Sequence, residues 1–136
     1  MKAIDTNVLA RFFIDDADDP EAMKQRPAAT AAMSAKVYVP LTVMLEFEWV
    51  MRGFYALPRK DIERVFEALC GLENVQIENR SSVLAALNGY QRGLDFADAL
   101  HLASAASCTA LLSFDRRLKK MATTRGMFPP VEIPQR

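Results

Sequence analysis

An uncharged run from Ala99 to Phe114 constrains the fold of this chain more than any other feature. The run is too short to cross a bilayer as one helix, and it contains three serines and a threonine. It therefore predicts a buried helix followed by a buried strand. Acidic residues stand at both ends, because Asp95 and Asp98 open the segment and Asp115 closes it. A fold that buries this run must place carboxylates at the edge of its core.

Length and composition predict one soluble, cytoplasmic domain spanning residues 1–136. A chain of 136 residues can bury about two thirds of its unfolded surface. Its 17 basic and 17 acidic residues leave no global basic field, so nucleic-acid binding would need a local basic patch or metal ions. The N-terminal segment has no apolar core of the length that a signal peptide needs. Cys70 and Cys108 fit no metal spacing and predict two buried, reduced thiols.

Segments with strand and helix character alternate along the chain. The expected strands are residues 2–4, 36–39, 75–77, 111–114 and 130–133. The expected helices are residues 7–14, 20–34, 42–54, 59–70 and 115–122. Two further helices are expected, one capped by Ser81 and Ser82 with Val83, Leu84 and Leu87 inward, and one capped by Asp95. This order predicts an α/β fold with a central parallel sheet of about five short strands and helices on both faces. Sites in such sheets form beyond the carboxyl ends of the strands.

Two expected strands end in aspartate. Asp5 follows the first strand and Asp115 follows the fourth. If these strands are neighbours, both carboxylates lie at the same rim of the sheet. Aspartate is also a common cap where a strand turns into a helix, so a structural role remains open for either residue alone.

The helix expected at residues 42–54 contains two glutamates with different surroundings. Glu48 lies four residues before Arg52, in the order that favours an exposed ion pair. Glu46 then points to the opposite, more apolar side, together with Trp49. A carboxylate on an apolar side is costly unless it meets a partner such as a cation. Glu46 is therefore the candidate site residue, and Glu48 is expected on the solvated face.

The acids that precede the uncharged run fit the start of a helix. Asp95 suits the N-cap, and Asp98 falls in the first turn, where free backbone N–H groups favour negative charge. Because the helix that follows must be buried, Asp98 is also expected near the rim that carries Asp5 and Asp115. His101, one turn later, is expected to be a core or supporting residue.

Four acids are thus candidates for one site: Asp5, Glu46, Asp98 and Asp115. Carboxylates without histidine or cysteine partners select hard cations, Mg²⁺ or Mn²⁺. Clustered like charges are unstable unless metal neutralises them or protons are taken up. One or two such ions can activate a water and stabilise the charge of a phosphodiester under attack, which is nuclease chemistry.

Four motifs in this order resemble the PIN domain and, within it, the VapC-type toxin ribonucleases of toxin–antitoxin pairs. They are DTN at 5–7, LEFEW around Glu46, DFADALHLA around Asp98 and LLSFD ending at Asp115. The resemblance runs from Lys2 to about Ile133. It implies Mg²⁺- or Mn²⁺-dependent endonucleolytic cleavage of RNA at the four acids, with Thr6, Asn7 and Ser113 supporting the metal or water. It also implies a homodimer, inhibited by a cognate antitoxin whose tail enters the active-site groove.

Two further groups of residues have open interpretations. Arg116, Arg117, Lys119 and Lys120 follow Asp115 directly and either contact RNA phosphates or form an exposed helical face. Phe12, Phe13, Trp49, Phe54 and Tyr55 are more aromatic residues than one small core needs. Some of them suit a dimer or antitoxin surface, although core packing is the expectation for any one of them.

Other classes of protein fit less well. A receiver-like signalling module needs an aspartate after a central strand and a lysine after the last one, but the third strand here ends in Ile77-Glu78 and the last in Ile133-Pro134. A haloacid-dehalogenase-like phosphatase needs a second aspartate where this chain has Asn7. A housekeeping RNA-processing nuclease would have the same acidic site, and a non-catalytic interaction module remains a further alternative.

Overall fold

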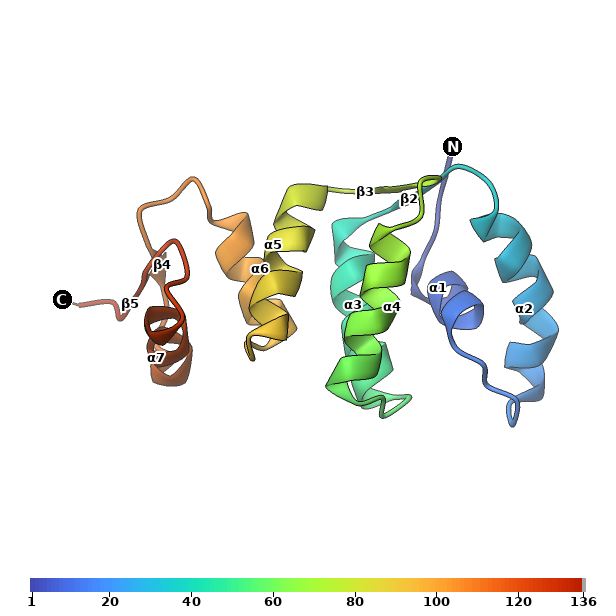
Figure 1. Cartoon of the computed structure of the whole chain (residues 1–136), viewed down its shortest axis with the longest axis horizontal. Helices are drawn as coiled ribbons and strands as arrows, with labels where there is room; N and C mark the ends of the chain where they lie inside the picture. Colours follow the sequence, from blue (N-terminus) through green and yellow to red (C-terminus); the bar gives the residue numbers. More distant parts are fainter. Residues whose placement is uncertain (136) are drawn as a thin grey trace. The chain divides into compact units, whose positions relative to one another are not determined.

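The computed structural model describes residues 1–135, which form seven helices and five strands in two compact units (Figure 1). Unit 1 comprises Met1–Arg80, and unit 2 begins at Ser81. All strand pairs are parallel, so the expected α/β class and the number of strands are confirmed. The expected single sheet is corrected: three strands form a sheet in unit 1 and two form a separate sheet in unit 2.

The sheet of unit 1 has the order β1-β2-β3, with β1 at Lys2–Ala3, β2 at Val37–Val39 and β3 at Val75–Ile77. The central strand pairs with β1 through Val37 and Tyr38, and with β3 along its whole length. Valine and isoleucine suit these positions because branched side chains pack well on a pleated surface.

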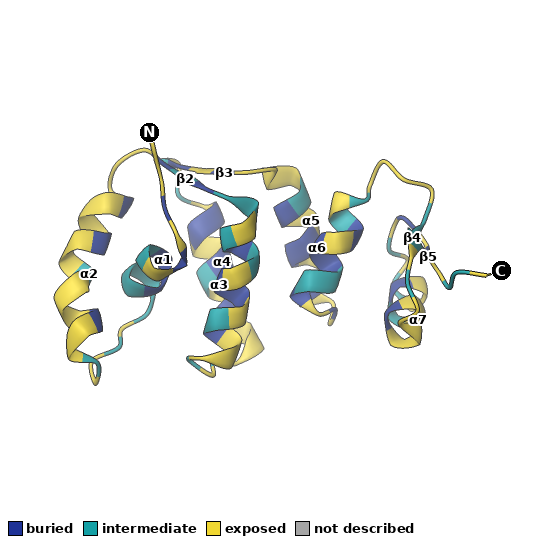
Figure 2. Cartoon of the chain, turned by 180° about the vertical axis from the view of Figure 1, so that it is seen from behind, coloured by how far each residue is buried: buried dark blue, intermediate teal, exposed yellow. Residues whose placement is uncertain are grey.

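Four helices complete unit 1: α1 (Thr6–Phe13), α2 (Pro20–Met33), α3 (Leu41–Gly53) and α4 (Arg59–Cys70). The α1 helix packs against α2 and α3, and α3 packs against α4. Phe47 of α3 lies at the centre, with its ring centroid 6.2 Å from that of Phe13 and 6.0 Å from that of Phe66. Most of α2 is exposed, whereas α3 and α4 each have a buried face (Figure 2).

Unit 2 contains α5 (from Arg80 to Gln91), α6 (Phe96–Ser104), β4 (Leu111–Leu112), α7 (Arg116–Thr124) and β5 (Val131–Glu132). Close packing joins α5 to α6, since a Cβ atom at Gly89 would lie 3.2 Å from the Cβ of Ala99. Tyr90 and Phe96 meet edge to face nearby, with ring centroids 5.7 Å apart. In the second sheet β4 pairs with β5, and α7 packs against β5.

Several local expectations for unit 2 are wrong. Ser81 and Ser82 do not cap α5, because the helix already begins at Arg80. Leu84 is exposed, whereas Val83 and Leu87 are buried as expected. The stripe that packs inward is spaced i, i+3, i+4, i+7, and Leu84 falls beside it. The stripe consists of Val83, Ala86, Leu87 and Tyr90.

The uncharged run has two different halves. Its helix is buried as expected, with Ala99, Leu100 and Leu102 facing inward. Its strand is not, because Leu112 is 62% exposed and Phe114 is 78% exposed. Alternate side chains of an extended segment point to the same side, and Leu112 and Phe114 share the exposed side here.

Both cysteines are free, as the sequence predicts, but only Cys70 is buried and Cys108 is exposed. Across residues 1–135, none of the helices combines the length and apolar character needed to cross a membrane.

Candidate active site

Asp5 lies at the junction between β1 and α1. It is the N-cap of α1, and its Oδ1 accepts a hydrogen bond of 3.0 Å from the backbone N–H of Asn7. The carboxylate is exposed. Asp5 therefore has the capping role considered from the sequence, and it also lies just beyond the carboxyl end of β1. One bond to a backbone N–H leaves an aspartate further lone pairs for another ligand.

Thr6, the next residue, links Asp5 to Glu46. Thr6 is buried, and its Oγ1 donates a hydrogen bond to Oε1 of Glu46 on α3. A hydroxyl that donates to a carboxylate holds the side chain in one direction. Within unit 1, the residue that directly follows Asp5 therefore contacts Glu46. The family resemblance implies a supporting role for Thr6 at metal or water, but it does not predict the contact with Glu46.

The expected faces of α3 are reversed. Glu46 is exposed, whereas Glu48 is only 3% exposed. The buried stripe runs at i, i+3, i+4 and i+7 through Met44, Phe47, Glu48 and Met51. The argument that Glu46 needs a cation because it lies on an apolar side is therefore wrong. This stripe of three large apolar residues was the signal that could have revealed the error.

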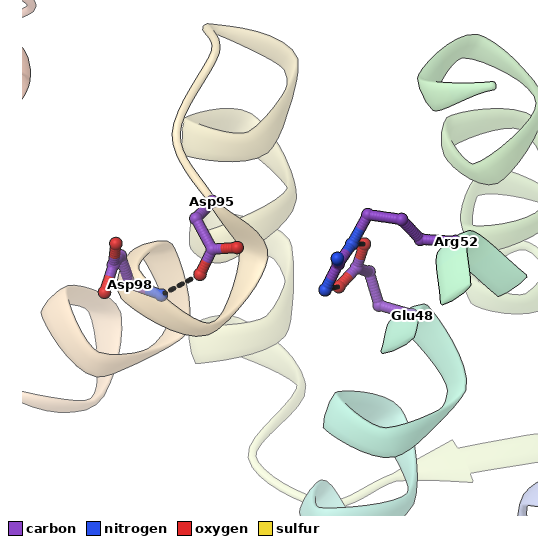
Figure 3. A network of polar contacts seen from close by, with 4 residues as sticks. All are labelled: Glu48, Arg52, Asp95 and Asp98. Atoms are coloured by element: carbon purple, nitrogen blue, oxygen red, sulfur yellow. Dashed lines mark hydrogen bonds and ion pairs between the residues drawn. The ribbon is translucent and has the colours of Figure 1, made fainter. Parts of the chain in front are cut away.

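Glu48 is compensated by an ion pair. Arg52 Nε donates to Glu48 Oε2 at 2.9 Å, and Figure 3 shows the guanidinium lying over the carboxylate. The predicted i,i+4 pair is confirmed, but it joins a buried carboxylate to an exposed arginine. A buried charge keeps such a partner because an unpaired carboxylate is costly to desolvate. Glu48 therefore has a structural explanation.

In unit 2 the start of α6 has the predicted form. Asp95 is the N-cap, and its Oδ2 accepts a hydrogen bond of 3.2 Å from the backbone N–H of Asp98 (Figure 3). The side chain of Asp98 is half-buried and is acidic in the first turn. Asp95 is thus engaged in capping, while the carboxylate of Asp98 is left for another role.

The electrostatic surroundings of Asp98 are unfavourable for its charge. Burial raises the pKa of the Asp98 carboxyl, and the negative charges of Asp95 and Asp115 raise this pKa further. His101, which is exposed, acts in the opposite direction. His101 is therefore not a core residue, and its electrostatic effect lowers the pKa of Asp98. A shift with these causes is typical of sites that bind a cation or a proton.

Asp115 caps α7 much as Asp5 caps α1. Its Oδ1 accepts a hydrogen bond of 3.0 Å from the backbone N–H of Leu118. The backbone N–H of Asp115 donates at 3.0 Å to Oγ of Ser113, so the hydroxyl two residues earlier fixes the turn. Asp115 is exposed, and its negative charge raises the pKa of Asp98. Unit 2 therefore brings the other two candidate acids into electrostatic contact.

The remaining candidates lie on the surface. The four basic residues of α7, namely Arg116, Arg117, Lys119 and Lys120, are all exposed. Trp49 and Phe54 are also exposed, so the expectation of core packing is wrong for these two aromatic residues. Phe12, Phe13 and Tyr55 are half-buried.

The acids fall into two pairs, with Asp5 and Glu46 in unit 1 and Asp98 and Asp115 in unit 2. Within residues 1–135, no group of three or more histidine, cysteine or acidic side chains is placed to hold a metal ion. The donors themselves have the right chemistry, since all are carboxylates and the pKa of Asp98 is raised by neighbouring negative charge. Convergence of the four acids at one ion remains a prediction.

Comparison with known families identifies the class of protein. The model of the PIN domain matches residues 2–123, which include all four acids and most of both units. The chain therefore belongs to the PIN domain family, and the resemblance drawn from its motifs is confirmed.

A more specific similarity is to a ribonuclease. The chain is 28% identical over 124 residues to a VapC ribonuclease of Aquifex aeolicus (strain VF5), and the match covers 89% of this chain and 92% of the relative. No solved structure is significantly similar to the chain.

Proposed function

We propose that this protein is a Mg²⁺- or Mn²⁺-dependent endoribonuclease that hydrolyses RNA phosphodiester bonds. The observation that carries the proposal is the half-buried Asp98, whose ionisation is opposed by Asp95 and Asp115. A divalent cation would relieve this clustering of negative charge. Membership of the PIN family and the similarity to a VapC ribonuclease support the same chemistry.

In this proposal residues 1–136 act as one PIN domain, whose catalytic acids are Asp5, Glu46, Asp98 and Asp115. Asp5 and Asp98 are the direct metal ligands. Glu46 and Asp115 complete the site and hold a second ion or the attacking water. When bound, a divalent cation supplies an activated water and stabilises the charge that develops on the phosphate.

The chain's own polar groups position these acids. Thr6 holds the carboxylate of Glu46, while Asn7 N–H and Leu118 N–H fix Asp5 and Asp115. Ser113 restrains the turn that presents Asp115. Each of these contacts leaves carboxylate oxygens for another partner, because a single carboxylate accepts several bonds.

The exposed basic face of α7 is the proposed contact for RNA phosphates. Replacing both Arg116 and Arg117 by alanine should weaken binding equally for all RNA sequences. On single-stranded RNA it should also reduce the slope of log affinity against log salt by about 0.7 for each phosphate that is no longer neutralised. Filter binding at several salt concentrations measures the slope. A double variant with the wild-type slope would remove these residues from the RNA-binding surface.

The proposed biological role is that of the toxin of a toxin–antitoxin pair, acting in the cytoplasm as a homodimer and inhibited by a cognate antitoxin. The similarity to a VapC ribonuclease favours this role, and two free cysteines suit a reducing compartment. A housekeeping RNA-processing nuclease is the alternative. Growth arrest on expression, relieved by a protein encoded beside this one, separates the toxin from the housekeeping enzyme.

The test is cleavage of a mixed RNA pool by the purified protein in Mg²⁺, in Mn²⁺ and in EDTA, with Asp5→Asn as the control. Cleavage that needs both metal and Asp5 is the expected result. Mn²⁺ binding without cleavage of any RNA would indicate a very narrow target. Neither cleavage nor Mn²⁺ binding would mean that the acids are structural and that the protein is an interaction module.

A further inference from the structure

Trp49 is exposed on the same face of α3 as a candidate catalytic acid. The helix buries three of its large residues completely, since Met44, Phe47 and Met51 are 0% exposed. Trp49, in contrast, is 61% exposed, although a tryptophan loses more by exposure than any of these. Packing in unit 1 does not explain why this position holds an indole.

The position of Trp49 relative to Glu46 is fixed by the helix. Trp49 lies three positions after Glu46, which is about 4.5 Å along the helix axis. This spacing places the two side chains at neighbouring positions on the surface of the helix. Thr6 holds Glu46 by a hydrogen bond. The indole lies alongside the last turn of α3, where its Cε2 would be 3.8 Å from a Cβ atom at Gly53. The ring is therefore supported on one side and accessible to solvent.

The neighbours of Trp49 distinguish between two kinds of partner. The exposed residues of α3 that lie three, four or seven positions from Trp49 are Thr42, Glu46, Arg52 and Gly53, none of which is large and apolar. Protein interfaces use contiguous apolar patches. A nucleobase needs only one accessible aromatic face, and base stacking is how single-stranded RNA is commonly bound.

We propose that Trp49 is a stacking platform for the RNA base next to the phosphate that is cleaved. The inference rests on the proposed ribonuclease function and assigns one substrate contact to it. Stacking tolerates any base, so Trp49 holds the strand beside Glu46 and leaves the choice of sequence to other contacts. Trp49 binds substrate and transition state alike, and it therefore acts on KM more than on kcat.

Trp49 is the only tryptophan of the chain, so intrinsic fluorescence reports on this residue alone. The probes are single-stranded octamers of adenosine and of uridine and an abasic octamer with the same phosphates, added to Asp98→Asn protein in Mg²⁺. Both base-containing octamers should quench Trp49 with saturation, and the abasic octamer should not. In active protein, Trp49→Ala should raise KM by roughly 5- to 150-fold with little change in kcat. Trp49→Phe should retain most of the affinity, and Phe54→Ala is the matched control for loss of an exposed aromatic.

The outcomes separate this inference from the proposed function. RNA that binds, by the anisotropy of a labelled octamer, without altering Trp49 fluorescence would overturn the stacking role and leave the ribonuclease standing. So would Trp49→Ala protein that cleaves with the wild-type KM. A change of Trp49 fluorescence with protein concentration, without RNA, would assign the indole to an interface between copies and overturn the inference. Absence of both RNA binding and cleavage in wild-type protein would overturn both proposals.

Discussion

The two pairs of candidate acids differ in what surrounds them. In unit 1 Asp5 and Glu46 are exposed, and a buried threonine hydroxyl satisfies one of them. In unit 2 Asp98 is half-buried and faces the negative charges of Asp95 and Asp115. The pair in unit 1 is therefore already compensated by neutral donors, while the pair in unit 2 is electrostatically strained. We infer that Asp98 is the candidate acid whose charge a bound cation relieves most.

The largest effect is expected at Asp98. Asp98→Asn should lower cleavage by roughly a hundredfold or more, the scale on which a group at the reacting atoms acts. The same variant should melt no lower than wild type in metal-free buffer, because the substitution removes a charge that burial and two neighbours disfavour. RNA cleavage and calorimetry measure the two effects. Asp95→Asn is the matched control, since asparagine still caps α6 and cleavage should persist. Activity near wild type in Asp98→Asn would refute the assignment.

In unit 1 a smaller effect is expected from the threonine. Thr6→Val removes the hydroxyl that holds Glu46 but keeps the shape of the side chain, so cleavage should fall by roughly 10- to 100-fold, as for groups that orient metal ligands. Thr6→Ser keeps the donor and should retain most activity. Steady-state kinetics of the two variants gives the comparison. Equal activity in the valine and serine variants would show that the contact has no role in cleavage.

Asp5 combines a capping role with a proposed metal ligand, and two substitutions separate them. Asp5→Asn should keep the cap of α1, whereas Asp5→Ala should lose about 1 kcal/mol of unfolding free energy. Cleavage should be lost in both. Urea unfolding measures the first quantity. If asparagine destabilised the protein as much as alanine, the cap would depend on the negative charge and not on the hydrogen bond.

The smallest expected effect is the dependence of stability on pH. Because the pKa of Asp98 is raised in the folded state, the native protein holds this proton more tightly than the unfolded chain. The contribution of Asp98 to stability is therefore present below the usual pKa of aspartate and is lost as pH rises through the raised pKa. The melting temperature of wild type minus that of Asp98→Asn, measured in EDTA, should fall across this window. Mg²⁺ should reduce the fall, and a flat difference in EDTA would contradict the assigned surroundings of Asp98.

Local structure was predictable from the sequence where one strong signal decided it. The bounds of α4 and β3 are those expected, because the helical spacing of Ile62, Phe66 and Leu69 has no competitor. The cap at Asp95 also follows from the chemistry of helix termini. Asp5, Asp98 and Asp115 were proposed in the same way, from their places at strand ends and helix starts, whereas Glu46 was proposed from an apolar position that it does not occupy.

The faces of α3 were not predictable by counting apolar residues alone. Glu48 lies inside a stripe of large apolar side chains, and Arg52 compensates its charge from the exposed side. Trp49 has the opposite character, since it is apolar and exposed. The spacing of Met44, Phe47 and Met51 indicates the buried face, whereas the apolar character of Trp49 taken alone indicates the wrong one. The expectation that all five strands share one sheet was also wrong, because strand pairing depends on contacts between residues distant in sequence.

The central claim is that Asp5, Glu46, Asp98 and Asp115 bind the divalent cation on which cleavage depends. A crystal structure of the protein soaked in Mn²⁺, with the ion located by its anomalous scattering, tests this most directly. We predict an ion whose carboxylate ligands include both Asp5 and Asp98. An ion that lacks Asp5 or Asp98 as a ligand, or no ion at any of the four acids, would contradict it.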